Sequence, residues 1–406
     1  MHKGIIPRIN NYAKITFFYT TKQFYHKKLH KRTNTRNKSG NNLKFSAKIN
    51  IFARYNPRHM TRKKKIGWGI FIAAAAVLTA TAILLGYPYY KVKIKKVKLN
   101  ETAYLYITPD DNSASIMEKL EKLTGGQSTE GFSILAQHNN FDSRKRSGKF
   151  AIKNGDSMHD IYRRIVSNEQ TPVRVTVPST RTVELMAGTV SKQIMADSAS
   201  LASLLKNDTY MSCFGYTPET AISLIIPDTY EVYWNIDAEQ FIQKLAEERR
   251  KFWNENRKAK AKEIGLTAEE VATLASIVDE ETANTSEMPT VAGLYINRLK
   301  KGMMLQADPT VKYALGDPTR RRILNKDLEV NSPYNTYKHT GLPPGPIRIP
   351  TKQALESVLN YKKHDYLYMC AKEDFSGTHN FAKTLSEHNS NAQRYQQALN
   401  RLNIKK

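Results

Sequence analysis

The longest apolar run of the chain covers residues 66–90, which hold no charged side chain. An α-helix rises about 1.5 Å per residue, so roughly 20 such residues cross the hydrocarbon core of a bilayer. Trp68 near one end and Tyr89 near the other are typical of membrane interfaces. A cleaved signal peptide is the alternative, but its apolar region is usually shorter and ends in small residues. The pattern therefore predicts a single uncleaved transmembrane helix over residues 66–90.

Beyond this run the pattern changes to short periodic segments. Alternating Lys and aliphatic residues predict a half-exposed strand at 91–99. Residues 148–166 predict a strand, a turn and an amphipathic helix, which together make a small β–α unit. This unit resembles the LysM-like modules of glycan-binding proteins, and a plain α/β spacer explains it equally well. A strand predicted at 173–177 ends this module near residue 175, so that it covers residues 91–175.

Residues 176–406 alternate helical and strand-like segments with loops rich in Pro and Gly, a pattern typical of an α+β domain. The sequence has no phosphate-binding loop, no dinucleotide-binding fingerprint and no Gly-x-Ser-x-Gly nucleophile motif. We therefore expect an α+β protein with a transmembrane helix, a small LysM-like α/β module and a larger α+β domain that carries the chemistry.

The strongest helical signal in the large domain begins at Thr267, which forms a capping box with Glu270. The helix ends in three consecutive acids. Helical periodicity places Glu281 and Asp279 at the two edges of the apolar stripe and points Glu280 into solvent. A carboxyl at the boundary between core and water is partly desolvated, which raises its pKa, as a general acid requires. Glu281 is therefore the candidate acid, and an ordinary solvated helix end is the alternative.

Charge is distributed unevenly along the chain. The net charge of +26 suggests a nucleic-acid-binding protein, but residues 1–100 contain 23 of the 63 Lys and Arg residues and no acid. The remaining 40 basic residues are balanced by 37 acidic ones, so we expect no nucleic acid as partner. The basic and aperiodic residues 1–65 are predicted to be disordered, and the compact start at Met60 suggests that translation begins there. Basic residues on both sides of the apolar run give only a slight preference for a cytoplasmic N-terminus.

The sequence indicates no metal and no cofactor, because no Cys and His residues have the spacing of a zinc site. Its two cysteines, Cys213 and Cys370, are expected to be buried free thiols, with a single disulfide as the alternative.

The stretch from residue 220 to 390 resembles the endolytic murein transglycosylases of the MltG (YceG-like) family. Seven short segments in family order carry the resemblance: residues 227–231 (Pro-Asp-Thr-Tyr-Glu), 274–282 (Leu-Ala-Ser-Ile-Val-Asp-Glu-Glu-Thr), 291–299 (Val-Ala-Gly-Leu-Tyr-Ile-Asn-Arg-Leu), 302–311 (Gly-Met-Met-Leu-Gln-Ala-Asp-Pro-Thr-Val), 332–337 (Ser-Pro-Tyr-Asn-Thr-Tyr), 341–345 (Gly-Leu-Pro-Pro-Gly) and 377–381 (Gly-Thr-His-Asn-Phe). The sequence departs from the family at residues 222–226, where a Glu that the family often carries is missing.

The resemblance implies a lytic transglycosylase, a carbon–oxygen lyase that cleaves the MurNAc–GlcNAc bond of nascent peptidoglycan strands, leaves 1,6-anhydroMurNAc ends and terminates strand elongation. The family's catalytic glutamate corresponds to Glu281, with Asp279 as the runner-up. In this chemistry one carboxyl protonates the bridging oxygen and then removes the proton of the MurNAc 6-hydroxyl, which replaces a second carboxylate. The substrate-binding candidates are Gln306, Asp308, Tyr334, Asn335, Tyr337 and His379.

The resemblance also implies a single-pass protein of the cell inner (plasma) membrane, with a cytoplasmic N-terminus, a periplasmic or otherwise extracytoplasmic catalytic domain and partnership with peptidoglycan synthases. Two other functions remain open. One is a non-catalytic, membrane-anchored glycan-binding protein. The other is a muramidase that uses a second carboxylate, Asp279 or Asp308, and leaves reducing ends.

Overall fold

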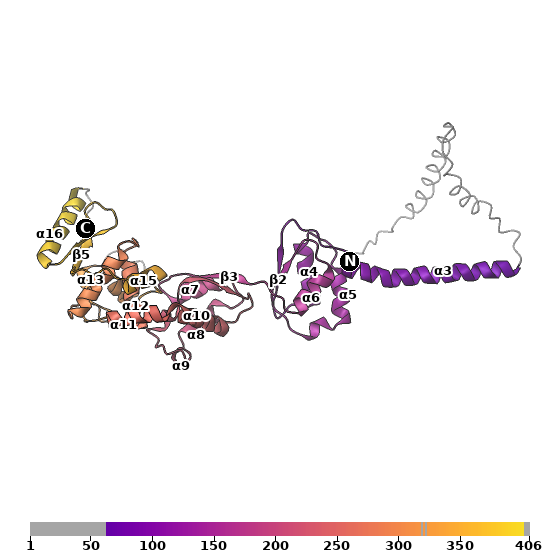
Figure 1. The fold of residues 1–406 in the computed structure, drawn as a ribbon, viewed down its shortest axis with the longest axis horizontal. Coiled ribbons are helices and arrows are strands. Elements are labelled where there is room, and N and C mark those ends of the chain that lie inside the picture. The colour runs from indigo at the N-terminus through magenta and orange to yellow at the C-terminus, as the bar shows by residue number, and fades with distance from the viewer. Residues whose placement is uncertain (1–61, 318–319, 321–322, 402–406) are drawn as a thin grey trace, which may run out of the picture. The chain divides into compact units, whose positions relative to one another are not determined.

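The computed structural model describes residues 62–317, 320 and 323–401 (Figure 1). The predicted disorder of residues 1–61 and the predicted start at Met60 lie outside these residues. Helix α3 (Arg62–Tyr89) contains the apolar run, and the segment Ile66–Ile94 is long and apolar enough to cross a membrane. Residues 62–65, which we assigned to the disordered segment, are helical. The chain divides within α3 into two compact units, Met1–Ile83 and Leu84–Lys406.

The first part of the second unit is a two-stranded sheet packed with three helices. Its elements are η2 (Tyr90–Ile94), β1 (Ala103–Ile107), α4 (Ser113–Leu123), α5 (Glu130–His138), η3 (Phe141–Ser143), β2 (Gly148–Ile152) and α6 (Met158–Val166). Strand β1 pairs antiparallel with β2, with Leu105 opposite Phe150. Both side chains are buried in one apolar cluster with Phe132 and Ile161.

The predicted β–α unit at residues 148–166 is confirmed as β2 followed by α6, and α6 begins with a capping box at Ser157. The strand predicted at 91–99 is wrong. Residues 90–94 form a π-helical turn, and only Lys96 makes an isolated bridge, to Ser157. Sheet β1–β2 has only two strands, and residues 91–99 do not pair with it as a third. The helical turn η2 instead packs against α5 and α6, which buries Val92.

The next part contains a second antiparallel pair, in which the predicted strand 173–177 is found. Its elements are β3 (Val173–Val177), α7 (Val183–Val190), α8 (Ser198–Leu205), α9 (Asp208–Ser212), η4 (Ala221–Leu224), β4 (Asp228–Val232) and α10 (Ala238–Phe252). Val175 lies opposite Tyr230 in this sheet, and both side chains are buried with Met186, Leu201 and Phe241.

The last part is built around helix α12. Its elements are α11 (Glu255–Ile264), α12 (Ala268–Glu281), α13 (Met288–Lys300), α14 (Asp308–Leu315), η5 (Asn325–Glu329), α15 (Lys352–Leu359), β5 (Tyr368–Ala371), β6 (His379–Ala382) and α16 (Leu385–Arg401). Helices α11, α13, α14 and α15 all contact α12, and all eight residues of 271–278 are buried. Strands β5 and β6 form a hairpin against α16.

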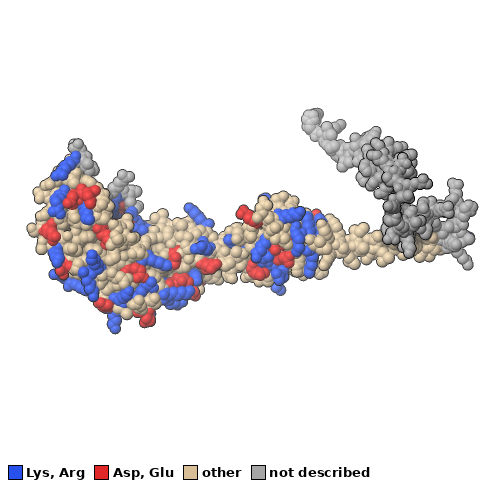
Figure 2. Space-filling model, turned by 45° about the horizontal axis from the view of Figure 1, so that its top comes forward, with Lys and Arg blue, Asp and Glu red and all other residues tan. Residues whose placement is uncertain are grey.

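The described residues thus form mixed helix and sheet with one apolar N-terminal helix, as the α+β prediction requires. On the face shown in Figure 2, basic and acidic side chains are interspersed over the part of the chain that follows the apolar helix. This mixture agrees with the balance of 40 basic and 37 acidic residues beyond residue 100.

Candidate active site

Helix α12 fixes the position of Glu281. The helix begins at the predicted capping box, in which the Thr267 hydroxyl accepts a hydrogen bond from the Glu270 amide and the Glu270 carboxylate accepts one from the Thr267 amide. It ends at Glu281, because Thr282 has an extended backbone. With its preceding turns buried on every side, the helix holds Glu281 at the boundary of the core, where its side chain is partly buried.

Glu281 has the environment of a carboxyl that is protonated near neutral pH. Burial raises the pKa of Glu281 to about 7, and the nearby Asp308 carboxylate also raises it. The Tyr295 hydroxyl, which donates a hydrogen bond of 2.7 Å to Glu281 Oε1, and the electrostatic influence of nearby His379 act in the opposite direction. Desolvation outweighs both effects, so the neutral acid is well populated at pH 7.

Glu281 lies in a cavity of about 260 Å³. The cavity brings together five side chains proposed from the sequence, namely Glu281, Gln306, Asp308, Tyr337 and His379. It is completed by Leu294, Tyr295, Arg298, Leu305, Met369, Cys370 and Ala371. A small cavity in which several polar groups converge on one carboxyl of displaced pKa is the usual form of an active site.

Arg298 joins two walls of this cavity. Its side chain is buried and donates hydrogen bonds to the carbonyls of Met304, Leu305 and Leu367 and to Gln306 Oε1, at 2.6–3.1 Å. Gln306 itself has a left-handed backbone conformation with φ of 50°. A guanidinium group suits this task, because it presents five N–H donors in a fixed plane.

Asp308 and Tyr337 form a second polar contact in the cavity. Asp308 is the first residue of α14, where Pro309 occupies the first turn. The Tyr337 hydroxyl donates to Asp308 Oδ1 at 2.6 Å, and burial raises the pKa of Tyr337. Asp308 is exposed and therefore accessible to a ligand.

His379 is bound by a carboxylate that the sequence analysis missed. Glu287, directly before α13, accepts hydrogen bonds from the His379 backbone N–H and from its ring at Nδ1, both at 2.8 Å. Glu287 is the only acid between residues 282 and 307, and this isolation was the available signal. The sequence analysis also missed Tyr295 and Arg298. Both lie in an apolar segment with helical spacing, where Tyr295 resembled a core residue and Arg298 a surface residue.

Two of the residues proposed from the sequence lie outside the cavity. Asn335 has no exposed surface, and its amide donates to the carbonyls of Leu328 and Val330 while its oxygen accepts from the Tyr337 amide. Its side chain organises the loop, so a direct sugar contact by Asn335 is not retained. The Tyr334 ring is partly buried and packs on Tyr313, with ring centres 4.6 Å apart.

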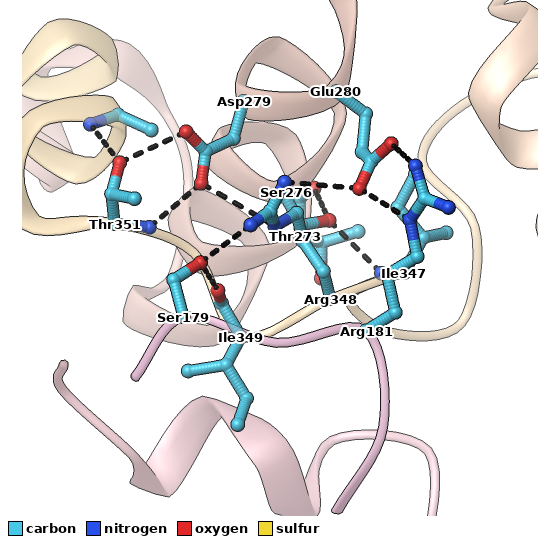
Figure 3. Close-up of polar contacts among 11 residues, drawn as sticks. Ser179, Arg181, Thr273, Ser276, Asp279, Glu280, Ile347, Arg348, Ile349 and Thr351 are labelled. Atoms are coloured by element: carbon cyan, nitrogen blue, oxygen red, sulfur yellow. Dashed lines mark hydrogen bonds and ion pairs between the residues drawn. The ribbon is translucent and has the colours of Figure 1, made fainter. Parts of the chain in front are cut away.

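The other two acids at the end of α12 bind residues of other chain segments (Figure 3). Asp279 accepts hydrogen bonds from the Thr351 amide and hydroxyl, both at 2.9 Å. The prediction that Glu280 points into solvent is wrong, because its side chain is only 11% exposed. Glu280 binds Arg181 through two hydrogen bonds and Arg348 through one, at 2.6–3.0 Å. Periodicity along one helix could not reveal two arginines that come from distant segments.

The pKa of Glu280 distinguishes it from Glu281. Burial alone would raise it, but the hydrogen bond from Arg181 and the charge of Arg348 outweigh burial and lower it below its usual value. Glu280 borders a different cavity, of about 390 Å³, with apolar walls from Pro309, Tyr313 and Ile347. An ionised, doubly paired carboxylate cannot donate a proton at neutral pH, so this cavity lacks the acid that the first one has.

Cys213 is exposed and Cys370 partly buried, and both thiols are free, so the prediction of free thiols is confirmed and the burial of Cys213 is wrong. Among the residues that the structure describes, no group of three or more His, Cys, Asp and Glu side chains is placed to hold a metal ion.

These features define an α+β protein with a site built around one carboxyl of raised pKa at the end of a buried helix. The model of the YceG-like family matches residues 105–394, and the chain belongs to this family, which confirms the resemblance found in the sequence.

Curated relatives agree with this assignment. An endolytic murein transglycosylase of Bacillus subtilis (strain 168) is 44% identical over 141 residues, which cover 35% of this chain and 38% of the relative. One from Streptococcus pneumoniae serotype 2 (strain D39) is 28% identical over 355 residues, covering 79% of this chain and 63% of the relative. The match therefore spans less than two thirds of either relative. The crystal structure of a yceG-like protein of Listeria monocytogenes is 26% identical, with a TM-score of 0.49, and the match covers 72% of this chain and 99% of that one.

Proposed function

We propose that the chain is an endolytic peptidoglycan lytic transglycosylase with Glu281 as its catalytic acid. The observation that carries the proposal is the pKa of about 7 that burial gives to this carboxyl in a cavity of converging polar groups. The names of the two curated relatives support the same substrate, the glycan strand of peptidoglycan.

The chemistry follows from the protonation state of Glu281. The neutral carboxyl donates its proton to the oxygen between MurNAc and GlcNAc while the bond from that oxygen to C1 breaks. The MurNAc 6-hydroxyl then gives up its proton, which in the single-carboxyl chemistry returns to the Glu281 carboxylate, and its oxygen closes on C1 to form the 1,6-anhydro ring, so no water is consumed. Because the nucleophile belongs to the substrate, its high effective concentration replaces a second carboxylate of the enzyme.

The remaining polar residues of the cavity take substrate-binding roles in this proposal. Gln306 and Asp308 are exposed and lie beside the acid, so they are available to the N-acetyl and hydroxyl groups of the sugars. Tyr337 is partly exposed and adds an aromatic wall, whereas Tyr334 packs on Tyr313 outside the cavity and takes no part in it.

The test is the Glu281→Gln variant of the full chain, incubated with glycan strands whose ends are analysed by mass spectrometry. We expect the variant to fold and to bind strands, and to form anhydro ends about 10²–10⁴-fold more slowly than the wild type. Anhydro ends formed at the wild-type rate would reject Glu281. Intact strands with the wild-type protein would favour the glycan-binding alternative, and reducing ends would favour the two-carboxylate muramidase.

We also propose a topology and a division of the chain. The apolar helix anchors the protein in the plasma membrane with the N-terminus in the cytoplasm, a LysM-like module covers residues 91–175, and residues 176–406 form the catalytic domain. Peptidoglycan synthases are proposed partners, because the substrate is the strand that they make. A reporter fused after Lys406 should be active only outside the cytoplasm, and a cytoplasmic signal would contradict the topology.

A further inference from the structure

The pair formed by Glu287 and His379 has a geometry that the single-carboxyl chemistry does not use. The Glu287 side chain is 9% exposed and the His379 side chain 17%. His379 is the first residue of β6 and lines the same cavity as Glu281, whereas Glu287 lies behind it at the start of α13. The two residues are 92 positions apart and joined by two hydrogen bonds of 2.8 Å.

The hydrogen bonds around Glu287 determine where the protons lie. The Thr282 hydroxyl accepts from the Asn284 amide, so its own proton points to Glu287 Oε2, at 3.1 Å. The His379 amide donates to Oε1. With donors at both oxygens, Glu287 acts as an ionised acceptor. The His379 ring nitrogen at 2.8 Å from Oε2 must then carry a proton, which makes Nδ1 the protonated nitrogen.

This arrangement leaves His379 Nε2 for the cavity. Among the described residues no group hydrogen-bonds His379 Nε2, and this atom is not sealed in the interior. The groups around the cavity are Glu281, Asp308, Arg298 and the hydroxyls of Tyr295 and Tyr337. Its small volume, about 260 Å³, allows one sugar ring to contact both Glu281 and His379.

We propose that His379, held in this tautomer by Glu287, is the base of the reaction and takes the proton of the MurNAc 6-hydroxyl. The inference rests on the proposed function and assigns to a second residue the step that a single carboxyl would otherwise perform. Glu287 is then a positioning residue. A buried carboxylate that orients an imidazole whose other nitrogen faces the substrate is a recurring arrangement for a base.

The proton balance closes without a co-reactant. The Glu281 O–H bond breaks and its proton goes to the bridging oxygen, which leaves with the electrons of its bond to C1. The 6-hydroxyl oxygen forms the new bond to C1, and its proton moves to His379 Nε2. The imidazolium then returns a proton to the Glu281 carboxylate through solvent, which restores both groups for the next cleavage.

The experiment compares His379→Asn, His379→Ala and Glu287→Gln in the full chain, with anhydro-end formation as the readout. The Asn amide can replace the Nδ1 donor to Glu287 but has no nitrogen at the Nε2 position, so this variant keeps the structural bond and lacks the base. We expect unchanged thermal unfolding, a kcat lower by about 10²–10⁴-fold and a KM within about threefold of wild type. Glu287→Gln should lower kcat by a smaller factor.

Rescue by added imidazole and the pH profile of the activity distinguish a base at His379 from a purely structural role of this residue. Added imidazole should restore part of the activity of His379→Ala, and the acidic limb of the wild-type pH profile should be missing in His379→Asn. A wild-type kcat in His379→Asn overturns the proposal, and so does a lowered kcat with no rescue and an unchanged acidic limb. If Glu281→Gln is inactive in the same assay, only the role of His379 has failed, whereas an active Glu281→Gln rejects the proposed function itself.

Discussion

The Tyr295 hydroxyl donates a hydrogen bond of 2.7 Å to Glu281 Oε1, and this bond opposes the effect of burial on the same carboxyl. Burial raises the pKa of Glu281, while the Tyr295 bond lowers it, and the result is about 7. Tyr295 is itself buried in α13, so the contact is fixed by the packing of α13 against α12. The two helices together hold Glu281 close to half-protonated at neutral pH.

Tyr295→Phe should shift the pH dependence of cleavage toward higher pH. The substitution removes the donor that stabilises the Glu281 carboxylate and keeps the ring in the core, so the pKa of Glu281 rises above 7. The alkaline limb of kcat/KM reports this group, because Glu281 must be protonated to act. The measurement is the rate of anhydro-end formation over a series of pH values.

The same variant has a defined stability cost. Loss of one hydrogen bond with little change in shape should lower the free energy of unfolding by about 1–2 kcal/mol. Tyr361→Phe is a suitable control, since its hydroxyl contacts Lys300 and lies outside the cavity. An alkaline limb that stays in place or moves to lower pH in Tyr295→Phe would contradict the proposed role of Glu281.

Glu281→Gln should become more stable relative to the wild type as pH rises. The pKa of Glu281 is 4.5 in its ordinary state and about 7 in the fold, so the folded protein binds more protons than the unfolded chain between these values. The wild type therefore loses stability over this window, by up to about 3 kcal/mol, and the Gln variant does not. Urea unfolding of both proteins near pH 4 and pH 8 measures the difference, and equal shifts at the two pH values would refute it.

The sequence predicted the elements that depend on local signals. The capping box at Thr267 and the strand at 173–177 were found because neighbouring residues determine them. The strand at 91–99 was wrong, since a ladder partner is a tertiary property and the described residues give this segment only the single bridge from Lys96 to Ser157. The burial of Glu280 was missed for a related reason, because Arg181 and Arg348 are 99 and 68 residues away from it.

The candidate site was predictable to a similar extent. Glu281 could be selected because one helix places it at the edge of its own apolar stripe. Glu287 could not, since its significance depends on His379 from a distant hairpin. Asn335 was chosen for its chemistry, and only the fold places that amide inside a loop with its donors bound to backbone carbonyls.

Glu280→Gln should destabilise the fold without stopping cleavage. It weakens the ion pairs with Arg181 and Arg348, and partly buried charged hydrogen bonds of this kind contribute about 1–3 kcal/mol. The lowered pKa of Glu280 fixes the sign of the pH dependence: the contribution is present above pH 4.5 and disappears as pH falls through the folded pKa. Thermal unfolding should therefore separate variant and wild type at pH 7 and much less near pH 3.

Asp279→Asn is the matched comparison for Glu280→Gln. It weakens the cap on α15 at Thr351 but touches no residue of the Glu281 cavity, so much of the activity should remain below the unfolding temperature. An inactive Asp279→Asn together with an active Glu281→Gln would make Asp279 the acid.

Arg298→Lys should reduce both stability and activity although the charge is conserved. Arg298 donates to three carbonyls and to Gln306, on both sides of the cavity, and an ammonium group on a flexible stem cannot reproduce that planar set of bonds. Buried and partly buried carbonyls left without donors should lower the free energy of unfolding by about 2–4 kcal/mol. Because Gln306 and the start of the β5–β6 hairpin then lose their common support, kcat/KM should fall by at least about tenfold even in the folded variant. Urea unfolding and the rate of anhydro-end formation are the two measurements, with exposed Lys301→Ala, directly after α13, as the control. Wild-type kcat/KM in a destabilised Arg298→Lys would mean that the two walls keep their positions without the guanidinium, and that Arg298 contributes to folding alone.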